Sequence, residues 1–275
     1  MLKKIKKGDI VVRNSYNRDV IFVVDRVIKD KIVWLTGITT RLKADAPMED
    51  IEVIEKNEAM RIYNDVNKKI KEVANNIEIE KNNFLKRSDK VIYTGRILHL
   101  DGDRRYGVKS SMYYRKMGLR AVVRNVPEFR QSDIVNPLID RYNPDILIVT
   151  GHDGMLKKGK LYEDLYNYRN SRYFAQTVIN ARKNEKGKKL VIFAGACQSY
   201  YEALIGAGAN FASSPARILI DFMDPLVVAK KIATTDSNKF LTINDIEDEL
   251  RDGERGINRN RRNGQKENIR TLIKR

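Results

Sequence analysis

Short runs rich in Val and Ile alternate with polar turns over residues 1–54. Side chains branched at Cβ favour strands, while the Asn, Ser, Lys and Asp residues between the runs favour chain reversal. This pattern predicts a small SH3-like or Tudor-like β-barrel module built from short, twisted strands. The predicted strands lie within DIVVRNS, DVIFVVDRVI and KIVWLTGITTRL.

From residue 55 to residue 90, apolar residues recur every three or four positions, which is the period of one helix face. Lys and Glu occupy the positions between them. The pattern predicts a long connecting helix whose apolar stripe is a packing surface, with Asn75-Asn76 as the place where a break would fall. The stripe consists of Ala59, Ile62, Tyr63, Val66, Ile70, Val73 and Ile77.

Strands and helices alternate from residue 91 to residue 250. Alternation with short connections predicts an α/β fold with a mainly parallel sheet flanked by helices. In such sheets the chemistry lies beyond the carboxyl ends of the strands, so the candidate functional residues are those that follow each strand. Residues 251–275 are basic and poor in large apolar side chains, which predicts a flexible tail. The predicted strands lie within VIYTGRILHLDGD, LRAVVRNV, DILIVTGHDG, KKLVIFAGAC and ARILIDFMD.

Two of these strand ends carry reactive groups. His152 follows one strand and Cys197, the one cysteine of the chain, follows the next, 45 residues later. That spacing leaves room for one helix, so both side chains are expected at the same edge of the sheet on neighbouring strands. An imidazole beside a thiol is the arrangement of a cysteine protease, with Cys197 as nucleophile and His152 as general base. A helix starting at Ser199 would lower the pKa of the thiol.

The glycine-flanked turn after His152 suggests where a reacting carbonyl would be held. The backbone N–H of Cys197, with an N–H from Asp153 or Gly154, could stabilise the oxyanion of a tetrahedral intermediate. A lone cysteine after an apolar strand is also commonly a small buried hydrophobic group, so the thiol on its own would not carry this interpretation. His99 lies inside another apolar run and is interpreted as structural or as a neighbour of the site.

Composition narrows the classes of partner. The chain has 53 Lys and Arg against 36 Asp and Glu, a net charge of +17, which makes nucleic acid a conceivable partner. The basic residues are spread along the chain, however, so this partner is not favoured. No apolar run reaches the length of a membrane span. A single cysteine excludes an internal disulfide and indicates a reducing cytoplasm, and with only two histidines neither a metal nor another cofactor is expected.

The order of strand, His-Gly turn, helix, strand and Ala-Cys resembles the caspase, gingipain and legumain group of cysteine proteases, except that Asp153 is inserted between His152 and Gly154. Four segments along nearly the whole chain resemble the YabG family of sporulation-specific proteases. The resemblance implies a caspase-like endopeptidase that cleaves after arginine and processes spore coat and cortex-associated proteins in the mother cell. The segments are GDIVVRNSYNRDVIFVVDRV, VIYTGRILHLDGD, DILIVTGHDGM and FAGACQSYYEALIGAGANFASSPARI.

An arginine-selective site needs a carboxylate that meets the guanidinium. Asp101 and Asp103 end the strand that contains His99, and gingipain-type enzymes place a specificity aspartate at a similar distance before the histidine. Both are therefore candidates for substrate binding, although Asp-Gly-Asp is also an ordinary polar turn. The weaker candidates are Asp153, Asp221 and Asp224.

Two other functions are weighed against a protease. An amidotransferase-like enzyme also places a cysteine at a strand-to-helix turn, but it draws its histidine from after the nucleophile and no histidine follows Cys197. A basic RNA-binding or spore-coat scaffold protein would use the charge and the N-terminal module without the thiol. Salt-dependent binding to nucleic acid that survives loss of Cys197 would favour it.

Overall fold

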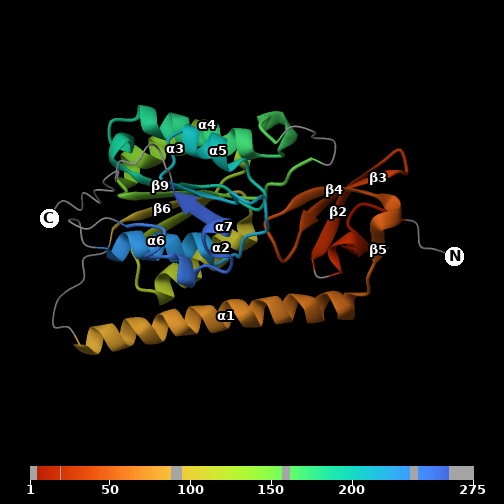
Figure 1. Cartoon of the computed structure of the whole chain (residues 1–275), viewed down its shortest axis with the longest axis horizontal. Coiled ribbons are helices and arrows are strands. Elements are labelled where there is room, and N and C mark those ends of the chain that lie inside the picture. Colours follow the sequence, from red (N-terminus) through yellow and green to blue (C-terminus); the bar gives the residue numbers. More distant parts are fainter. Residues whose placement is uncertain (1–4, 19, 88–94, 157–161, 236–240, 260–275) are drawn as a thin grey trace.

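The computed structural model describes residues 5–18, 20–87, 95–156, 162–235 and 241–259. Two sheets organise them, and one long helix runs alongside both (Figure 1). The N-terminal sheet has five strands in the order β4-β3-β2-β1-β5, and every neighbouring pair in it is antiparallel. Its strands are β1 (Ile10–Arg13), β2 (Ile21–Ile28), β3 (Ile32–Gly37), β4 (Lys43–Pro47) and β5 (Ile51–Val53).

The second sheet has six strands in the order β11-β10-β9-β8-β6-β7, and all neighbours are parallel except β10 and β11. The predicted α/β fold with a mainly parallel, helix-flanked sheet is therefore confirmed. The strand order reverses at β6, which is the kind of position where open α/β sheets form their ligand sites. The strands are β6 (Ile97–Asp101), β7 (Ala121–Asn125), β8 (Ile146–Thr150), β9 (Val191–Ala194), β10 (Phe211–Ser213) and β11 (Ile257–Arg259).

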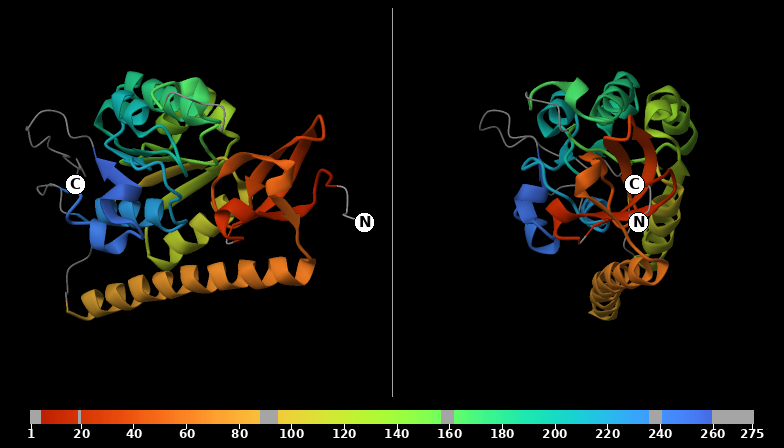
Figure 2. Two further views of the ribbon diagram at one scale, coloured as in Figure 1. Left: turned by 45° about the vertical axis from the view of Figure 1, so that its right-hand side comes forward. Right: turned by 90° about the vertical axis from the view of Figure 1, so that its right-hand side faces the viewer.

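Helices cover both faces of the second sheet (Figures 1 and 2). The helices α3, α4 and α5 form one layer, and α2 and α6 lie on the opposite face. The helices are α1 (Lys56–Arg87), α2 (Arg104–Lys116), α3 (Glu128–Tyr142), α4 (Ser171–Lys183), α5 (Tyr201–Gly206), α6 (Asp224–Thr234) and α7 (Gly253–Gly256). Within the described residues, no helix is both long and apolar enough to cross a membrane.

The central strands are apolar on both sides because each side faces a helical layer. In β8, Ile146 and Ile148 join the core beneath α2 and α6, whereas Leu147 and Val149 join the core beneath α3 and α4. The sequence of this strand therefore reads as a continuous apolar run and not as an alternating one.

The helix α1 packs along both parts of the molecule. Ala59 near its start contacts the core of the N-terminal sheet, and Ile70 contacts the core beneath α2. From Ala59 to Ile70, the predicted apolar stripe is thus a packing surface. The helix continues through Asn75-Asn76 without a break. The side chains of Val73 and Ile77 lie outside the described residues.

The segment ARILIDFMD is not a strand, contrary to the prediction. After β10 the chain turns through Ser214 and Arg217, both with positive φ, and leaves the sheet. The place beside β10 is taken instead by β11, which lies inside the region that the sequence assigned to a basic tail. The extended segment supplies Ile220 to a core shared with the N-terminal sheet. The rest of the tail, residues 260–275, lies outside the described residues.

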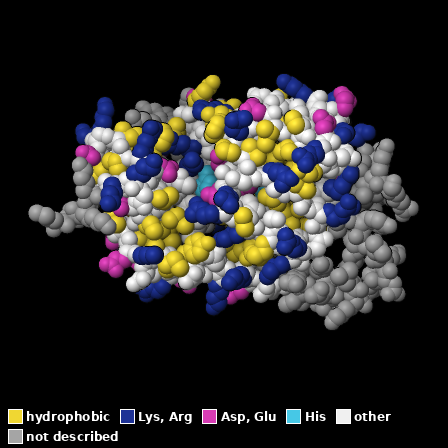
Figure 3. Space-filling view, turned by 180° about the vertical axis from the view of Figure 1, so that it is seen from behind, with side chains coloured by type: hydrophobic (Ala, Val, Ile, Leu, Met, Phe, Trp, Pro, Cys, Tyr) yellow, Lys and Arg dark blue, Asp and Glu magenta, His cyan; other side chains and the backbone are white. Residues whose placement is uncertain are grey.

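On the face shown in Figure 3, the Lys and Arg side chains of the described residues are dispersed. They alternate with apolar patches and with occasional acidic side chains. On this face, no continuous basic stripe of the kind that follows a nucleic-acid backbone is seen among the described residues.

Candidate active site

The carboxyl ends of three neighbouring strands bring the candidate residues together. The parallel strands β6, β8 and β9 lie side by side, so their carboxyl ends meet at one edge. Asp101 ends β6, His152 follows β8 and Cys197 follows β9. The N-terminal sheet packs against this same edge, where Lys43 N donates to the carbonyl oxygen of Asp153 at 2.7 Å.

Cys197 is completely buried. Its Sγ lies 3.2 Å from the hydroxyl of Thr40 and 3.8 Å from the carbonyl oxygen of Ile220. Burial raises the pKa of the thiol, with the hydrogen bonds to these two groups opposing the rise. The lowered pKa expected from a helix at Ser199 is therefore not found, because α5 begins only at Tyr201 and the desolvated sulfur favours its neutral form.

His152 is almost as deeply buried, with 3% of its surface exposed. Its Nε2 lies 3.3 Å from the carbonyl oxygen of Gly37, and since a carbonyl only accepts, Nε2 carries the proton. Burial lowers the pKa of the imidazole, while the charges of Glu128 and Asp103 act in the opposite direction. Although both residues are described, His152 and Cys197 make no hydrogen bond to each other.

Glu128 is a residue of the site that the sequence pattern does not point to. This residue opens α3, and its Oε1 accepts the backbone N–H of His152 at 2.8 Å. A Cβ added at Gly102 or Gly151 would lie 2.3 Å or 2.5 Å from its carboxylate, so both glycines make room for it. Glu128 thus fixes the turn that carries the imidazole. Its sequence position at a helix start gives no sign of this role, because acidic residues are common in the first turn of a helix.

The three backbone groups predicted to hold an oxyanion differ in their partners. The N–H of Cys197 has no acceptor among the described residues, whereas Asp153 N donates to the carbonyl oxygen of Arg41 at 3.1 Å. Gly154 N donates to the carboxylate of Asp153 at 2.9 Å. Two of the predicted donors are therefore engaged, and the N–H of Cys197 is unused.

The Asp153 carboxylate joins the elements that carry the candidate residues. It accepts hydrogen bonds from Ser171 at the start of α4 and from Ser199 in the turn after Cys197, at 2.5 Å and 2.8 Å. Burial raises its pKa to about 6, and these hydrogen bonds limit the rise. With its oxygens used in this way, Asp153 ties the two turns together.

Asp101 and Asp103 have different surroundings. Asp101 is fully buried and its Oδ2 lies 2.6 Å from Nη2 of Arg41. Asp103 caps α2 by accepting the backbone N–H of Arg105 at 2.7 Å, and its Oδ2 lies 4.0 Å from Nε2 of His152. Burial opposes ionisation of Asp103, but the hydrogen bond from Arg105 and the charge of His152 outweigh it and lower the pKa.

Asp221 and Asp224 lie near each other at the start of α6. Asp221 accepts the backbone N–H of Met223 at 2.8 Å, and Asp224 accepts those of Asp221 and Arg251. Burial and the charge of Asp221 raise the pKa of Asp224 to about 7. Both carboxylates therefore accept hydrogen bonds from backbone N–H groups nearby.

A loop of the N-terminal sheet enters the candidate site. Residues 37–42, which we call the 37–42 loop, join β3 to β4 and supply the groups that contact His152, Cys197 and Asp101. A Cβ at Gly154 would lie 1.9 Å from the carbonyl oxygen of Lys43, so this glycine allows the loop to approach closely. Sequence reasoning missed the loop because nothing in a polar turn indicates which distant edge it will reach.

His99 lies within β6 and is fully buried. Its Nδ1 is 3.1 Å from the hydroxyl of Tyr114 on α2, and its Nε2 is 2.7 Å from the hydroxyl of Thr150. Burial lowers the pKa of the imidazole to about 3, with Asp101 opposing this effect and Arg41 adding to it. The ring therefore stays neutral in the folded protein at neutral pH.

This neutral histidine should make the fold sensitive to acid. Between about pH 6.5 and pH 3 the unfolded chain binds a proton at His99 that the folded chain does not, so the free energy of unfolding should fall by up to about 1.4 kcal/mol for each unit that the pH is lowered. Urea unfolding at pH 7, 6 and 5 measures this slope. His99→Gln, which cannot be protonated, should lower stability but flatten the slope, and equal slopes in both proteins would contradict the assignment.

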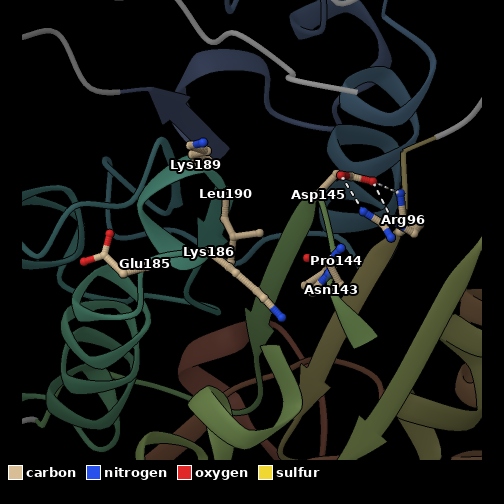
Figure 4. A pocket seen from close by; sticks show the side chains of 8 residues that line it. All are labelled: Arg96, Asn143, Pro144, Asp145, Glu185, Lys186, Lys189 and Leu190. Atoms are coloured by element: carbon tan, nitrogen blue, oxygen red, sulfur yellow. Dashed lines mark hydrogen bonds and ion pairs between the residues drawn. The ribbon is translucent and has the colours of Figure 1, made fainter. Parts of the chain in front are cut away.

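Two of the hollows among the described residues are lined by none of the candidate residues. A pocket of about 300 Å³ includes Trp34, Lys43 and Tyr173 where the N-terminal sheet meets α4. A pocket of about 420 Å³ lies at the amino edge of the second sheet, where Arg96 donates to both carboxylate oxygens of Asp145 (Figure 4). No group of three His, Cys, Asp or Glu side chains able to hold a metal ion occurs in the part of the chain that is described. The amino-edge pocket is lined by Arg96, Asn143, Pro144, Asp145, Glu185, Lys186, Lys189 and Leu190.

Comparison with known proteins gives two matches. The profile of the family described as YabG peptidase U57 matches residues 6–269 of the chain. The chain is also 36% identical over 248 residues to the sporulation-specific protease YabG of Bacillus subtilis (strain 168), which covers 83% of this chain and 84% of that protein. No solved structure matches. The range matched by the family profile includes both sheets and every candidate residue described above.

Proposed function

Because the chain belongs to the YabG peptidase U57 family, and is therefore a protease, we propose that it is a cysteine endopeptidase with Cys197 as nucleophile and His152 as general base. The observation that carries this proposal is the shared edge of β8 and β9, which delivers the one thiol of the chain and a histidine to the same place. The unused N–H of Cys197 supports it further, since that group is available to hold an oxyanion.

The reaction follows from these groups. His152 takes the proton of the thiol, and the sulfur attacks the carbonyl carbon of the scissile peptide bond. The N–H of Cys197 stabilises the negative oxygen of the tetrahedral intermediate, and His152 then gives its proton to the leaving amine. Water hydrolyses the remaining thioester and restores the thiol. Glu128 holds the turn of His152 in place and touches neither substrate nor sulfur in this scheme.

We extend the proposal to the fold and to the substrate. The second sheet, with five parallel strands and one antiparallel edge strand, is proposed to be caspase-like, and the N-terminal sheet to be an SH3-like or Tudor-like module. Cleavage is proposed to follow arginine, with Asp101 as the carboxylate that meets the guanidinium. Spore coat and cortex-associated proteins are the proposed substrates, in the mother cell of a sporulating bacterium. These finer points rest on resemblance to the family and on the placement of Asp101.

A peptide assay tests the proposed function. The purified full-length chain is incubated with matched peptides that contain arginine, lysine or citrulline at one position, and the products are identified by mass spectrometry. Cleavage on the carboxyl side of arginine that stops after treatment with iodoacetamide is the expected result. Proteolysis that continues after complete alkylation of Cys197 would exclude a thiol mechanism.

A further inference from the structure

The 37–42 loop contacts each of the three candidate residues with a different group. The carbonyl oxygen of Gly37 accepts the hydrogen bond from His152, and the hydroxyl of Thr40 lies against the sulfur of Cys197. Arg41 forms an ion pair with Asp101. The loop comes from the N-terminal sheet, whereas all three partners come from the second sheet. It therefore fills the candidate site from outside the sheet that builds it.

The guanidinium of Arg41 is buried beside one carboxylate and two aromatic rings, a position that we call the slot. Its Nη2 is 2.6 Å from Asp101, and its central carbon lies 4.8 Å from the ring centre of Tyr106 and 5.2 Å from that of Phe222. The slot thus offers one carboxylate and two aromatic faces, which together suit an arginine side chain. Only 2% of Arg41 is exposed, yet its Nε and Nη1 find no hydrogen-bond partner among the described residues.

An arginine buried with unused donors is a poor structural choice. Taking a guanidinium out of water costs free energy that one ion pair does not fully offset, and the unpaired N–H groups add to that cost. A slot that exchanges one arginine side chain for another must bind each of them only moderately. Hydrogen bonds to every N–H of the guanidinium would hold Arg41 too tightly for a substrate arginine to replace it.

The backbone of the loop is also held in the manner of a bound peptide. The carbonyl of Arg41 accepts the N–H of Asp153 at 3.1 Å, Lys43 N donates back to the carbonyl of Asp153 at 2.7 Å, and Leu42 pairs with Asp153 as in a parallel sheet. Extended peptides commonly bind to proteins through such backbone pairs. The N–H that meets the Arg41 carbonyl is one of those that the sequence assigned to the oxyanion.

We propose that the 37–42 loop is a built-in pseudosubstrate, with Arg41 occupying the slot that a substrate arginine must enter. This proposal rests on the proposed function and adds to it an inactive state of the protease, in which the loop blocks the site. The partner of Sγ on the loop is the hydroxyl of Thr40, so the loop covers the sulfur with a side chain. Cys197 is fully buried and His152 nearly so, and a protein substrate reaches them only after the loop withdraws.

The activity of two matched variants tests whether Arg41 competes with a substrate arginine for the slot. Arg41→Gln removes the occupant's charge, whereas Arg13→Gln removes another buried ion pair, with Asp50, inside the same N-terminal sheet. If the slot is free one time in ten or less, Arg41→Gln should raise kcat/KM for a short arginine peptide by about 10-fold or more, mainly through KM. Alkylation of Cys197 by iodoacetamide should also become faster. Arg13→Gln should give neither gain.

Binding separates this proposal from the proposed chemistry. In a Cys197→Ala background, the melting temperature is measured with an arginine peptide and with its neutral citrulline counterpart. The arginine peptide should stabilise the protein selectively when Arg41 is replaced by Gln, and much less when Arg41 is present. This result would support the pseudosubstrate even if no protein in the series cleaved a peptide, in which case the proposed function alone would fail.

The overturning results are equally defined. A folded Arg41→Gln protein that cleaves and binds arginine peptides no better than the protein with Arg41 would make the ion pair with Asp101 purely structural. Should Arg41→Gln fail to fold, Arg41→Lys retains the charge but loses the planar contact with both rings, and a smaller gain in both measurements is expected. Unchanged kinetics and binding in a folded Arg41→Lys protein would then overturn the proposal.

Discussion

Replacement of Cys197 by alanine is expected to abolish proteolysis, lowering kcat/KM by about 10³-fold or more, because removal of any member of a catalytic unit leaves only what substrate binding and oxyanion stabilisation supply. His152→Ala should cause a loss of similar size, and the double variant should be little worse than either single one. Hydrolysis of an arginine peptide by full-length proteins, with circular dichroism as a check on folding, measures all three. The effects are far from additive only if the two side chains act together.

A comparison with Ser199 guards against a wrong nucleophile. Its hydroxyl lies close to Cys197 in the chain and donates to Asp153 at 2.8 Å, so it is the obvious alternative. Ser199→Ala removes one hydrogen bond from a buried carboxylate and should lower stability while keeping measurable cleavage. If Cys197→Ala cleaved the peptide and Ser199→Ala did not, the assignment of the nucleophile would be wrong.

Asp101→Asn is expected to lower kcat/KM for arginine peptides, relative to kcat/KM for a neutral peptide, by about 30-fold or more, since loss of one partner of a buried charge pair costs on the order of 2 to 5 kcal/mol. Cleavage of the neutral peptide by the same protein should not fall, because the replacement also breaks the ion pair with Arg41 that holds the 37–42 loop in the site. The ratio between the two substrates is the informative quantity, because withdrawal of the 37–42 loop would change both rates together. An unchanged ratio would place the specificity carboxylate elsewhere.

Asp103→Asn is the matched control for that experiment. Asp103 lies two residues further along, caps α2 and faces His152, not Arg41. Its replacement should preserve the preference for arginine. Because its negative charge raises the pKa of His152, the acid limb of the pH profile of kcat/KM should move to lower pH in this variant.

Local patterns in the sequence were sufficient wherever local physics decides the structure. The three-to-four-residue spacing from Ala59 to Ile70 marks one face of a helix, and that face packs against both cores. The apolar runs before His152 and Cys197 are strands of a parallel sheet, and their order along the chain already implies a common edge. These features depend on side-chain periodicity and on the short connections that place consecutive strands next to each other.

Local sequence patterns gave wrong predictions where contacts between distant segments decide the structure. The run ARILIDFMD has the composition of a strand, but the position beside β10 is occupied by β11, so the run lies outside the sheet. The turn after Cys197 contains Ser199, a good helix-starting residue, yet its hydroxyl is used by Asp153 and the helix begins later. In both cases the local preference is real and a tertiary contact overrides it.

The sequence by itself determined the helix-flanked parallel sheet, the long helix and the positions of a histidine and a cysteine at neighbouring strand ends. Only the tertiary structure decided that Glu128 holds the turn of His152 and that the 37–42 loop closes the edge. The pairs that do this are distant along the chain, with a separation of 60 positions from Arg41 to Asp101 and of 157 positions from Thr40 to Cys197. Such contacts depend on how two sheets pack against each other, and packing between distant segments leaves no periodic signal in either of them.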